Sequence, residues 1–170
     1  MPLSRRHLAI ASLVVTAAVG AWLAVGSSAG HDAAPQVRYT LLDGKQMSLA
    51  DLKGQVVLVN FWATSCTTCV AEMPQLVSTF EKYRGRGYQT VAVAMSYDPP
   101  AYVANFAESR QLPFSVAIDN TGEIARSFGD VRLTPTSMLI NKRGQIVKRY
   151  VGAPDFVALH RLVEQLLAET

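Results

Sequence analysis

The chain has few of the residues that would build a metal site. It contains only two cysteines, Cys66 and Cys69, and three histidines among its 170 residues. A structural zinc site takes four ligands. The histidines are scattered over the N-terminal leader, a polar stretch after it and a segment near the C-terminus: His7, His31 and His160. No metal site is therefore expected.

Charge is also sparse. Charged residues make up 17% of the chain and the net charge is only +3. The sequence has no internal repeat, no low-complexity tract and no stripe of basic residues interleaved with aromatics, so a nucleic-acid partner is not expected. Hydrophobic residues make up 49%, which is enough for a globular core, and the length suits one domain with a remainder.

That remainder is an N-terminal leader, residues 1–29. Arg5 and Arg6 precede an uncharged apolar stretch from Leu8 to Gly26, which is the layout of an export signal. The stretch is longer than the roughly 7–15 residues of a typical signal-peptide core and close to the roughly 20 that span a bilayer. We therefore expect either a cleaved signal peptide or a retained membrane anchor. In both cases the domain lies outside the cytoplasm, in the periplasm or facing it from the membrane.

The rest of the chain is expected to form a linker, residues 30–36, and one domain, residues 37–170. Apolar runs and alternation predict seven strands, at residues 37–42, 46–49, 56–62, 90–95, 114–118, 137–140 and 146–151. Helical spacing predicts helices at about 66–83, 102–110, 124–128 and 156–167. Strands alternating with helices predict an α/β fold, a central mixed sheet with helices on both faces. An N-terminal β-hairpin is added to it.

The two cysteines are separated by Thr67 and Thr68 in a CxxC spacing. Such a pair is a disulfide redox centre, half of a metal site or two unrelated core thiols. The buried strand 56–62 ends just before Cys66, so this residue is expected at a helix N-terminus, where N–H groups stabilise a thiolate. Cys69 lies one turn further in. We predict that Cys66 is the nucleophile, Cys69 the resolving cysteine, and their disulfide the redox centre, with no separate cofactor.

The run VVLVNFWATSCTTCVAEMPQL resembles the active-site segment of TlpA/ResA-like thiol–disulfide oxidoreductases of the thioredoxin superfamily. The resemblance continues in SLADLKGQ and SFGDVRLTPTSMLINKRGQIVKRYVG, so it extends from about Val37 to the C-terminus. It implies a thioredoxin-like fold and disulfide exchange with partner proteins. Members of this group often reduce apocytochrome c or the copper chaperones of oxidase assembly. The residues between the cysteines do not indicate whether the pair works as a reductant or as an oxidant. A reductant works here in an oxidising space, so a membrane electron donor of the DsbD/CcdA type is implied as a partner if this protein is a reductase, and is unnecessary if it is an oxidant.

The resemblance also implies roles for individual residues. Pro135 falls at the cis-proline of this group, and the backbone of Thr134 and Pro135 would face the cysteines and pair with the substrate chain. Sequence alone favours a trans bond, because only about 5–6% of X–Pro bonds are cis in folded proteins. Trp62 is expected to pack beside the site. Ser65 stands where the group usually has Trp, which removes apolar surface beside the nucleophile.

A second departure from the related proteins is Asn60, which occupies the position where thioredoxins carry a buried acid. An amide cannot titrate, so a proton relay from that position is absent. Two carboxylates are candidates for that role instead. Glu72 follows Cys69 by three residues. The ordinary interpretation of Glu72 is a helix-surface or capping carboxylate, and the alternative is that it influences the proton of Cys69. Asp98, at a strand end, is a second candidate for that role.

Two other functions remain open on the same fold. A copper-delivery or metal-binding module typically has a wider cysteine spacing and a nearby histidine, which this sequence does not offer. A thiol peroxidase of the peroxiredoxin type places proline and threonine before its reactive cysteine, whereas no proline lies between Pro35 and Pro74. Copper titration and peroxide consumption distinguish these functions from disulfide exchange.

Overall fold

The computed structural model describes residues 31–169. Helices and strands lie close to the ranges expected from the apolar pattern, with their ends shifted by a few residues. Their order is β1 (Arg38–Thr40), β2 (Gln46–Ser48), a 3-10 helix (Leu49–Leu52), β3 (Val56–Trp62), α2 (Thr67–Tyr83), a 3-10 turn (Arg84–Arg86), β4 (Tyr88–Ala94), α3 (Pro100–Ser109), β5 (Ser115–Ile118), α4 (Glu123–Ser127), β6 (Thr136–Ile140), β7 (Ile146–Val151) and α5 (Phe156–Ala168).

The central sheet has five strands in the order β5-β4-β3-β6-β7. Strands β3, β4 and β5 are parallel, because α2 and α3 carry the chain back between them. Strand β6 runs antiparallel to β3, and β7 returns antiparallel to β6 after a short turn. The two strands β1 and β2 form a separate antiparallel pair. This is the thioredoxin-like fold with an added N-terminal hairpin.

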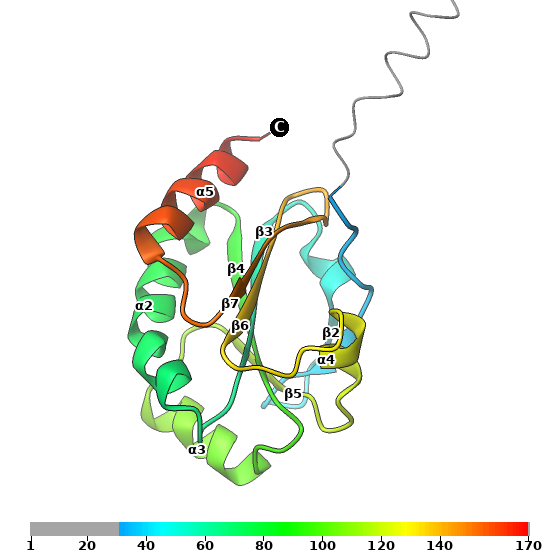
Figure 1. Ribbon diagram of the computed structural model, residues 1–170, viewed down its shortest axis with the longest axis vertical. Helices are drawn as coiled ribbons and strands as arrows, with labels where there is room; N and C mark the ends of the chain where they lie inside the picture. Colours follow the sequence, from blue (N-terminus) through cyan, green and yellow to red (C-terminus); the bar gives the residue numbers. More distant parts are fainter. Residues whose placement is uncertain (1–30, 170) are drawn as a thin grey trace, which may run out of the picture. The chain divides into compact units, whose positions relative to one another are not determined.

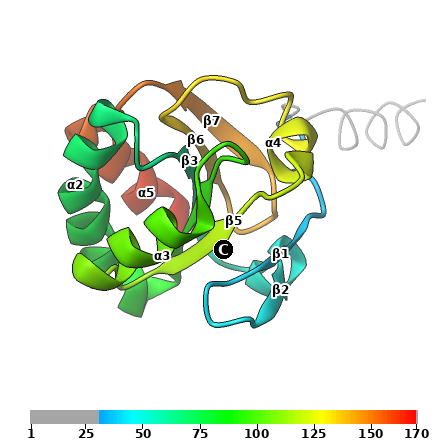
Figure 2. The same cartoon turned by 90° about the horizontal axis from the view of Figure 1, so that it is seen from below.

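Strand β3 lies at the centre of the sheet and is buried along its whole length. Its side chains alternate between two apolar clusters, with Leu58 and Trp62 in one and Val59 and Phe61 in the other. Helices α2, α3 and α5 cover the first face of the sheet, and the β1–β2 hairpin and α4 cover the second (Figures 1 and 2). Each fully buried side chain of this size contributes about 1.5–3 kcal/mol, so the two clusters hold β3 firmly in place.

The segment expected to be a linker is in contact with the domain from residue 32 onward. Ala34 is buried and its N–H donates to the carbonyl of Gly144 at 2.8 Å. The N–H of Ile146 donates to the carbonyl of Asp32, also at 2.8 Å. These are backbone contacts, which small and polar side chains do not reveal in the sequence. The leader predicted for residues 1–29 lies outside the described residues. Within residues 31–169 there is no helix with the length and apolar character needed to cross a bilayer.

Candidate active site

The redox pair lies where β3 gives way to α2. After Trp62 the chain makes a short loop, and α2 begins at Thr67 with Cys66 as its N-cap. Cys66 and Cys69 are joined by a disulfide, and their Cα atoms are 5.2 Å apart, within the usual range. The N–H of Cys69 also donates to the Sγ of Cys66 at 3.2 Å. The structure therefore confirms that Cys66 lies at a helix N-terminus.

The two sulfur atoms differ in access. Cys69 is fully buried in the apolar cluster under α2, whereas Cys66 is only partly buried and packs against the edge of that cluster. Ser65, Thr67 and Thr68 are exposed around it. A partner molecule can reach Cys66 from solvent, and Cys69 is reached only through Cys66.

The loop before β6 meets the same end of the sheet. The Thr134–Pro135 peptide bond is cis, and Thr136 pairs with Phe61 on β3. One further step in that antiparallel register places Pro135 beside Trp62, where the chain leaves β3 for the cysteines. The carbonyl of Pro135 accepts from the N–H of Gly152 at 2.8 Å, which ties this loop to the end of β7.

Trp62 closes the apolar cluster beneath the redox pair. Its side chain is fully buried and its ring centroid lies 5.1 Å from that of Phe106 on α3. Cys66 and Cys69 pack in the same cluster. The indole therefore supports the site through packing, as expected from the sequence.

Glu72 is not a surface or capping residue, and that ordinary interpretation of it is wrong. It is only 4% exposed, and its Oε1 accepts from the Nδ2 of Asn60 at 3.0 Å. Asn60 also donates to the Oγ of Ser137 at 2.9 Å, and Oε2 of Glu72 has no partner among the described residues. Burial disfavours the carboxylate and raises the pKa of Glu72 to about 7, although the Asn60 hydrogen bond opposes this. With its i,i+3 spacing, Glu72 shares a helix face with Cys69.

Asp98 holds the loop that precedes the nucleophile. Its carboxylate is buried and accepts from both the backbone N–H and the hydroxyl of Thr64, each at 2.6 Å. Thr64 lies two residues before Cys66, so this clamp fixes the approach of the chain to α2. The sequence indicated only that Asp98 follows a buried strand. A polar residue at the carboxyl end of a parallel strand is the signal that could have placed it here.

Sequence reasoning missed two further residues near the site. Ser137 on β6 accepts the second Asn60 hydrogen bond. Tyr97, in the loop after β4, has its hydroxyl 3.3 Å from that of Thr134. Both contacts join segments far apart in sequence, so neither has a local signature.

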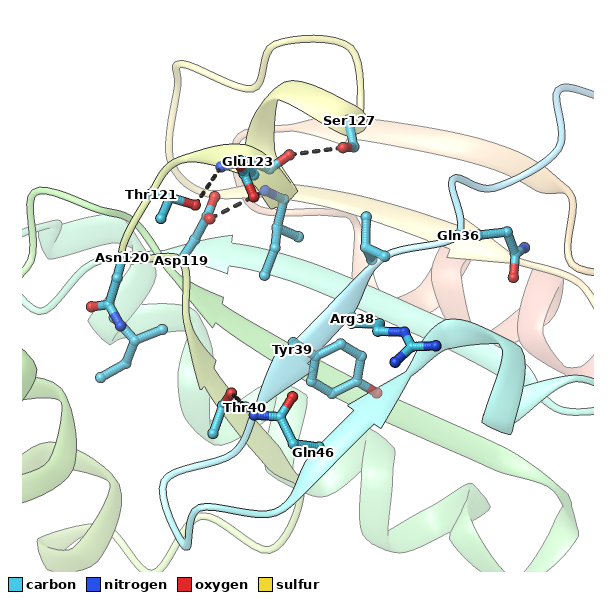
Figure 3. A pocket seen from close by; sticks show the side chains of 13 residues that line it. Gln36, Arg38, Tyr39, Thr40, Gln46, Asp119, Asn120, Thr121, Glu123 and Ser127 are labelled. Carbon is cyan, nitrogen blue, oxygen red and sulfur yellow. Dashed lines mark hydrogen bonds between the residues drawn. The ribbon is translucent and has the colours of Figure 1, made fainter.

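An open polar cavity of about 390 Å³ lies elsewhere, between β1, the end of β5 and α4. Figure 3 shows it. Asp119 at its edge is already used, because its carboxylate accepts from the N–H groups of Ile124 and Ala125 at 3.1 and 2.8 Å and so caps α4. The residues lining this cavity include neither cysteine nor Thr134, Pro135 or Glu72. It is therefore separate from the redox pair.

A disulfide with one accessible sulfur, set on this fold, defines a thiol–disulfide oxidoreductase of the thioredoxin superfamily. Comparison with known families supports the same class. The family model described as Redoxin matches residues 29–164. The chain belongs to the Redoxin family and, within it, is a TlpA/ResA-like protein.

Several relatives carry the name thiol-disulfide oxidoreductase ResA. The chain is 40% identical over 119 residues to the one from Bacillus thuringiensis subsp. konkukian, covering 70% of this chain and 68% of the relative. It is 34% identical over 133 residues to the one from Bacillus subtilis, covering 78% of this chain and 73% of the relative.

Among solved structures, a thiol:disulfide interchange protein from Chlorobium tepidum has a TM-score of 0.76 and 29% identity, with 84% of this chain and 100% of that chain covered. A protein described as a thioredoxin from Neisseria meningitidis also has a TM-score of 0.76, with 38% identity and coverage of 83% and 93%.

Proposed function

We propose that this protein is an exported reductant that transfers electrons to disulfides of partner proteins in cytochrome c or oxidase maturation. The observation that carries the exchange chemistry is the unequal access of the two sulfurs, Cys66 partly exposed and Cys69 buried. Export is supported by the leader of residues 1–29, and the pathway by the resemblance to TlpA/ResA-like proteins.

The reaction starts from the dithiol form. The Cys66 thiolate attacks one sulfur of a partner disulfide, forming a mixed disulfide and releasing the other partner sulfur as a thiolate, which takes up a proton. Cys69 then loses its proton and attacks Cys66 Sγ, which breaks the mixed disulfide and releases the second partner thiolate. That thiolate also takes up a proton. Two electrons pass to the partner, its two sulfurs gain the equivalent of the two protons given up by Cys66 and Cys69, and the protein ends as the Cys66–Cys69 disulfide. The pair carries both electrons, so no separate cofactor is needed.

Glu72 is the group that would accept the proton of Cys69. It lies one turn further along α2 and is buried with it. A general base works best when its pKa is near the ambient pH, and the pKa of Glu72 is raised to about 7 by burial. In the opposite direction, protonated Glu72 would supply the proton to the leaving Cys69 thiolate.

The remaining site residues position the substrate. The backbone of Thr134 and Pro135 would pair with the extended chain around the partner cysteine, beside the exposed residues Ser65, Thr67 and Thr68. Because the space outside the cytoplasm is oxidising, the dithiol must be restored after each turnover. A membrane donor of the DsbD/CcdA type would supply those electrons.

Trapping tests the exchange function and identifies the partner. The Cys69→Ser variant cannot resolve a mixed disulfide, so partner proteins should accumulate on Cys66 in cells, visible by non-reducing gels and named by mass spectrometry. The Cys66→Ser variant is the matched control and should trap none. Equal yields of adducts from the two variants would mean that Cys66 is not the nucleophile.

A second experiment tests the side of the membrane. A maleimide that cannot cross the cytoplasmic membrane should label Cys66 of the reduced Cys69→Ser variant in intact cells or spheroplasts. Labelling that requires cell lysis would contradict export. If the trapped partners include no cytochrome c or oxidase assembly protein, the pathway assignment is wrong while the exchange chemistry stands.

A further inference from the structure

A hydrogen bond crosses the end of the strand that carries the redox pair. In the sheet, β3 lies between β4 and β6. Tyr97 is in the loop after β4 and Thr134 in the loop before β6, and their hydroxyl oxygens are 3.3 Å apart. The side chain of Tyr97 therefore reaches across the C-terminal end of β3, where the chain leaves for Cys66.

The backbone around Tyr97 is held in place although the residue itself is exposed. The next residue, Asp98, is buried and clamped to Thr64. The N–H of Met95 donates to the carbonyl of Trp62 at 3.0 Å, which joins the start of this loop to β3. Tyr97 is nevertheless 57% exposed. A fixed loop thus presents an aromatic ring to solvent next to Thr134.

A second large apolar side chain flanks the same place. Leu133 directly precedes Thr134 and is 65% exposed. Its carbonyl accepts from the hydroxyl of Thr136 at 2.7 Å, so its backbone is fixed at the start of β6. Large exposed apolar side chains that gather at one place mark interaction sites more often than single ones do. The exposed residues beside Cys66 (Ser65, Thr67 and Thr68) carry no charge.

We propose that Tyr97 and Leu133 form an apolar rim that selects the substrate. The rim recognises an extended protein segment that has an aliphatic or aromatic side chain immediately beside its reactive cysteine. This inference rests on the proposed function, because the segment is the one that pairs with Thr134 while its sulfur meets Cys66. The Tyr97 hydroxyl orients the Thr134 side chain, and its ring supplies the contact surface. Selection is by apolar contact, since no charged residue is part of the rim.

Matched peptides test the rim. Two symmetric peptide disulfides, identical except for Leu or Ser immediately before the single cysteine, are reduced by the dithiol form of the full chain. Released peptide thiol is measured by chromatography. The dithiol is consumed as it reacts, so the quantity compared is the second-order rate constant of reduction. We expect it to be roughly three- to tenfold higher for the Leu peptide, the range expected for one apolar or aromatic contact. The ratio should change little between low and high salt.

Variants assign the preference to these residues. Tyr97→Ser and Leu133→Ser should each lower the Leu/Ser ratio towards one, whereas Tyr97→Phe, which keeps the ring, should preserve it. Tyr102→Ser is the matched control: this tyrosine on α3 is 64% exposed, and its variant should keep the wild-type ratio. Each variant is first shown to keep the wild-type circular dichroism spectrum and thermal unfolding midpoint, so that its ratio reports recognition and not misfolding.

The outcomes separate the two proposals. If the wild-type dithiol reduces neither peptide, the exchange function fails. If it reduces both peptides equally, or if Tyr97→Ser keeps the preference, the rim is overturned while exchange stands. Loss of the preference in Tyr97→Phe as complete as in Tyr97→Ser would also overturn the rim, because the ring would then not be the contact.

Discussion

The side-chain amide of Asn60 donates a hydrogen bond of 3.0 Å to the carboxyl group of Glu72 inside the protein core. Asn60 lies on β3 and Glu72 on α2, one turn after the buried Cys69. A neutral amide compensates only part of the cost of burying a carboxylate, and the pKa of Glu72 is accordingly raised to about 7. The titratable group near the resolving cysteine is therefore Glu72 on α2. Its hydrogen-bond partner on β3, Asn60, does not titrate.

The first prediction concerns the pH dependence of resolution. A mixed disulfide is formed on Cys66 and its decay is followed by rapid quenching, so that only the attack of Cys69 is measured. In the wild type the rate should rise as pH increases through about 7, because Glu72 becomes a carboxylate that can accept the Cys69 proton. Glu72→Gln should remove this rise and slow resolution above pH 7 on the order of 100-fold.

Glu72→Asp provides the matched comparison, since it keeps a titratable carboxyl group on the same helix position. It should retain a rise in the rate with pH, at a lower amplitude because the shorter side chain reaches less far. A wild-type profile that is preserved in Glu72→Gln would assign the proton transfer to another group.

The second prediction is a stability effect of the same carboxyl group. Its pKa in the folded protein, about 7, is above the ordinary value of 4.5, so the folded state binds this proton more tightly than the unfolded state does. The stabilisation of the folded state by this bound proton is fully present below about pH 4.5, and it is lost as pH rises through about 7. Relative to Glu72→Gln, the wild type should lose roughly 3 kcal/mol of unfolding free energy between pH 4 and pH 8.

Urea unfolding of the oxidised forms at several pH values measures this difference. The difference in unfolding free energy between the wild type and Glu72→Gln is plotted against pH. The slope of this plot reports the titration of Glu72, because a constant offset reports only the cost of the substitution itself. A flat difference across pH 4–8 would mean that the Glu72 carboxyl group is not desolvated in the folded protein.

Much of the fold could be read from local patterns. The run of apolar residues at 56–62 indicates a strand buried on both faces, and β3 has those bounds. Asp is a favoured N-cap residue, and Asp155, directly before the last helix, accepts from the N–H groups of Val157 and Ala158. These features depend on side chains that are close in sequence, so periodicity and capping chemistry suffice to predict them.

The helical spacing of the sequence indicates that Glu72 is buried, but its charged side chain favours the opposite interpretation. Its position shares the apolar helix face of Cys69, Leu76 and Tyr83, all of which are buried, but a carboxylate is ordinarily assigned to the surface. The Tyr97–Thr134 contact had no signal. It depends on β3 lying between β4 and β6, and alternation along a strand does not specify its neighbours. The order of strands in the sheet depends on tertiary packing and not on the local sequence pattern.

The third prediction follows from the unequal access of the sulfurs. In the reduced protein, iodoacetamide should modify Cys66 at least about tenfold faster than Cys69, measured by mass spectrometry of digested samples. A buried thiol reacts only after local opening, and an opening that costs about 1.4 kcal/mol already gives this factor. In concentrated urea the two rates should converge. Equal rates under native conditions would contradict the burial of Cys69.

The last prediction concerns the clamp between Asp98 and Thr64. Asp98→Ala removes the acceptor of two short hydrogen bonds and leaves the Thr64 N–H without its partner. Hydrogen bonds to charged groups contribute about 1.5–3 kcal/mol, so the variant should lose roughly 2–4 kcal/mol of unfolding free energy. Insulin reduction should also slow, because the loop before Cys66 is no longer held in place.

Thr64→Val is the matched partial change, since it deletes the hydroxyl bond and keeps the backbone one. It should cost about 1–2 kcal/mol, less than Asp98→Ala. The double variant should be no less stable than Asp98→Ala alone, because the hydroxyl has already lost its acceptor there. Strictly additive losses in this double-mutant cycle would show that the two residues act independently, and the loop before the nucleophile would then be held by other contacts.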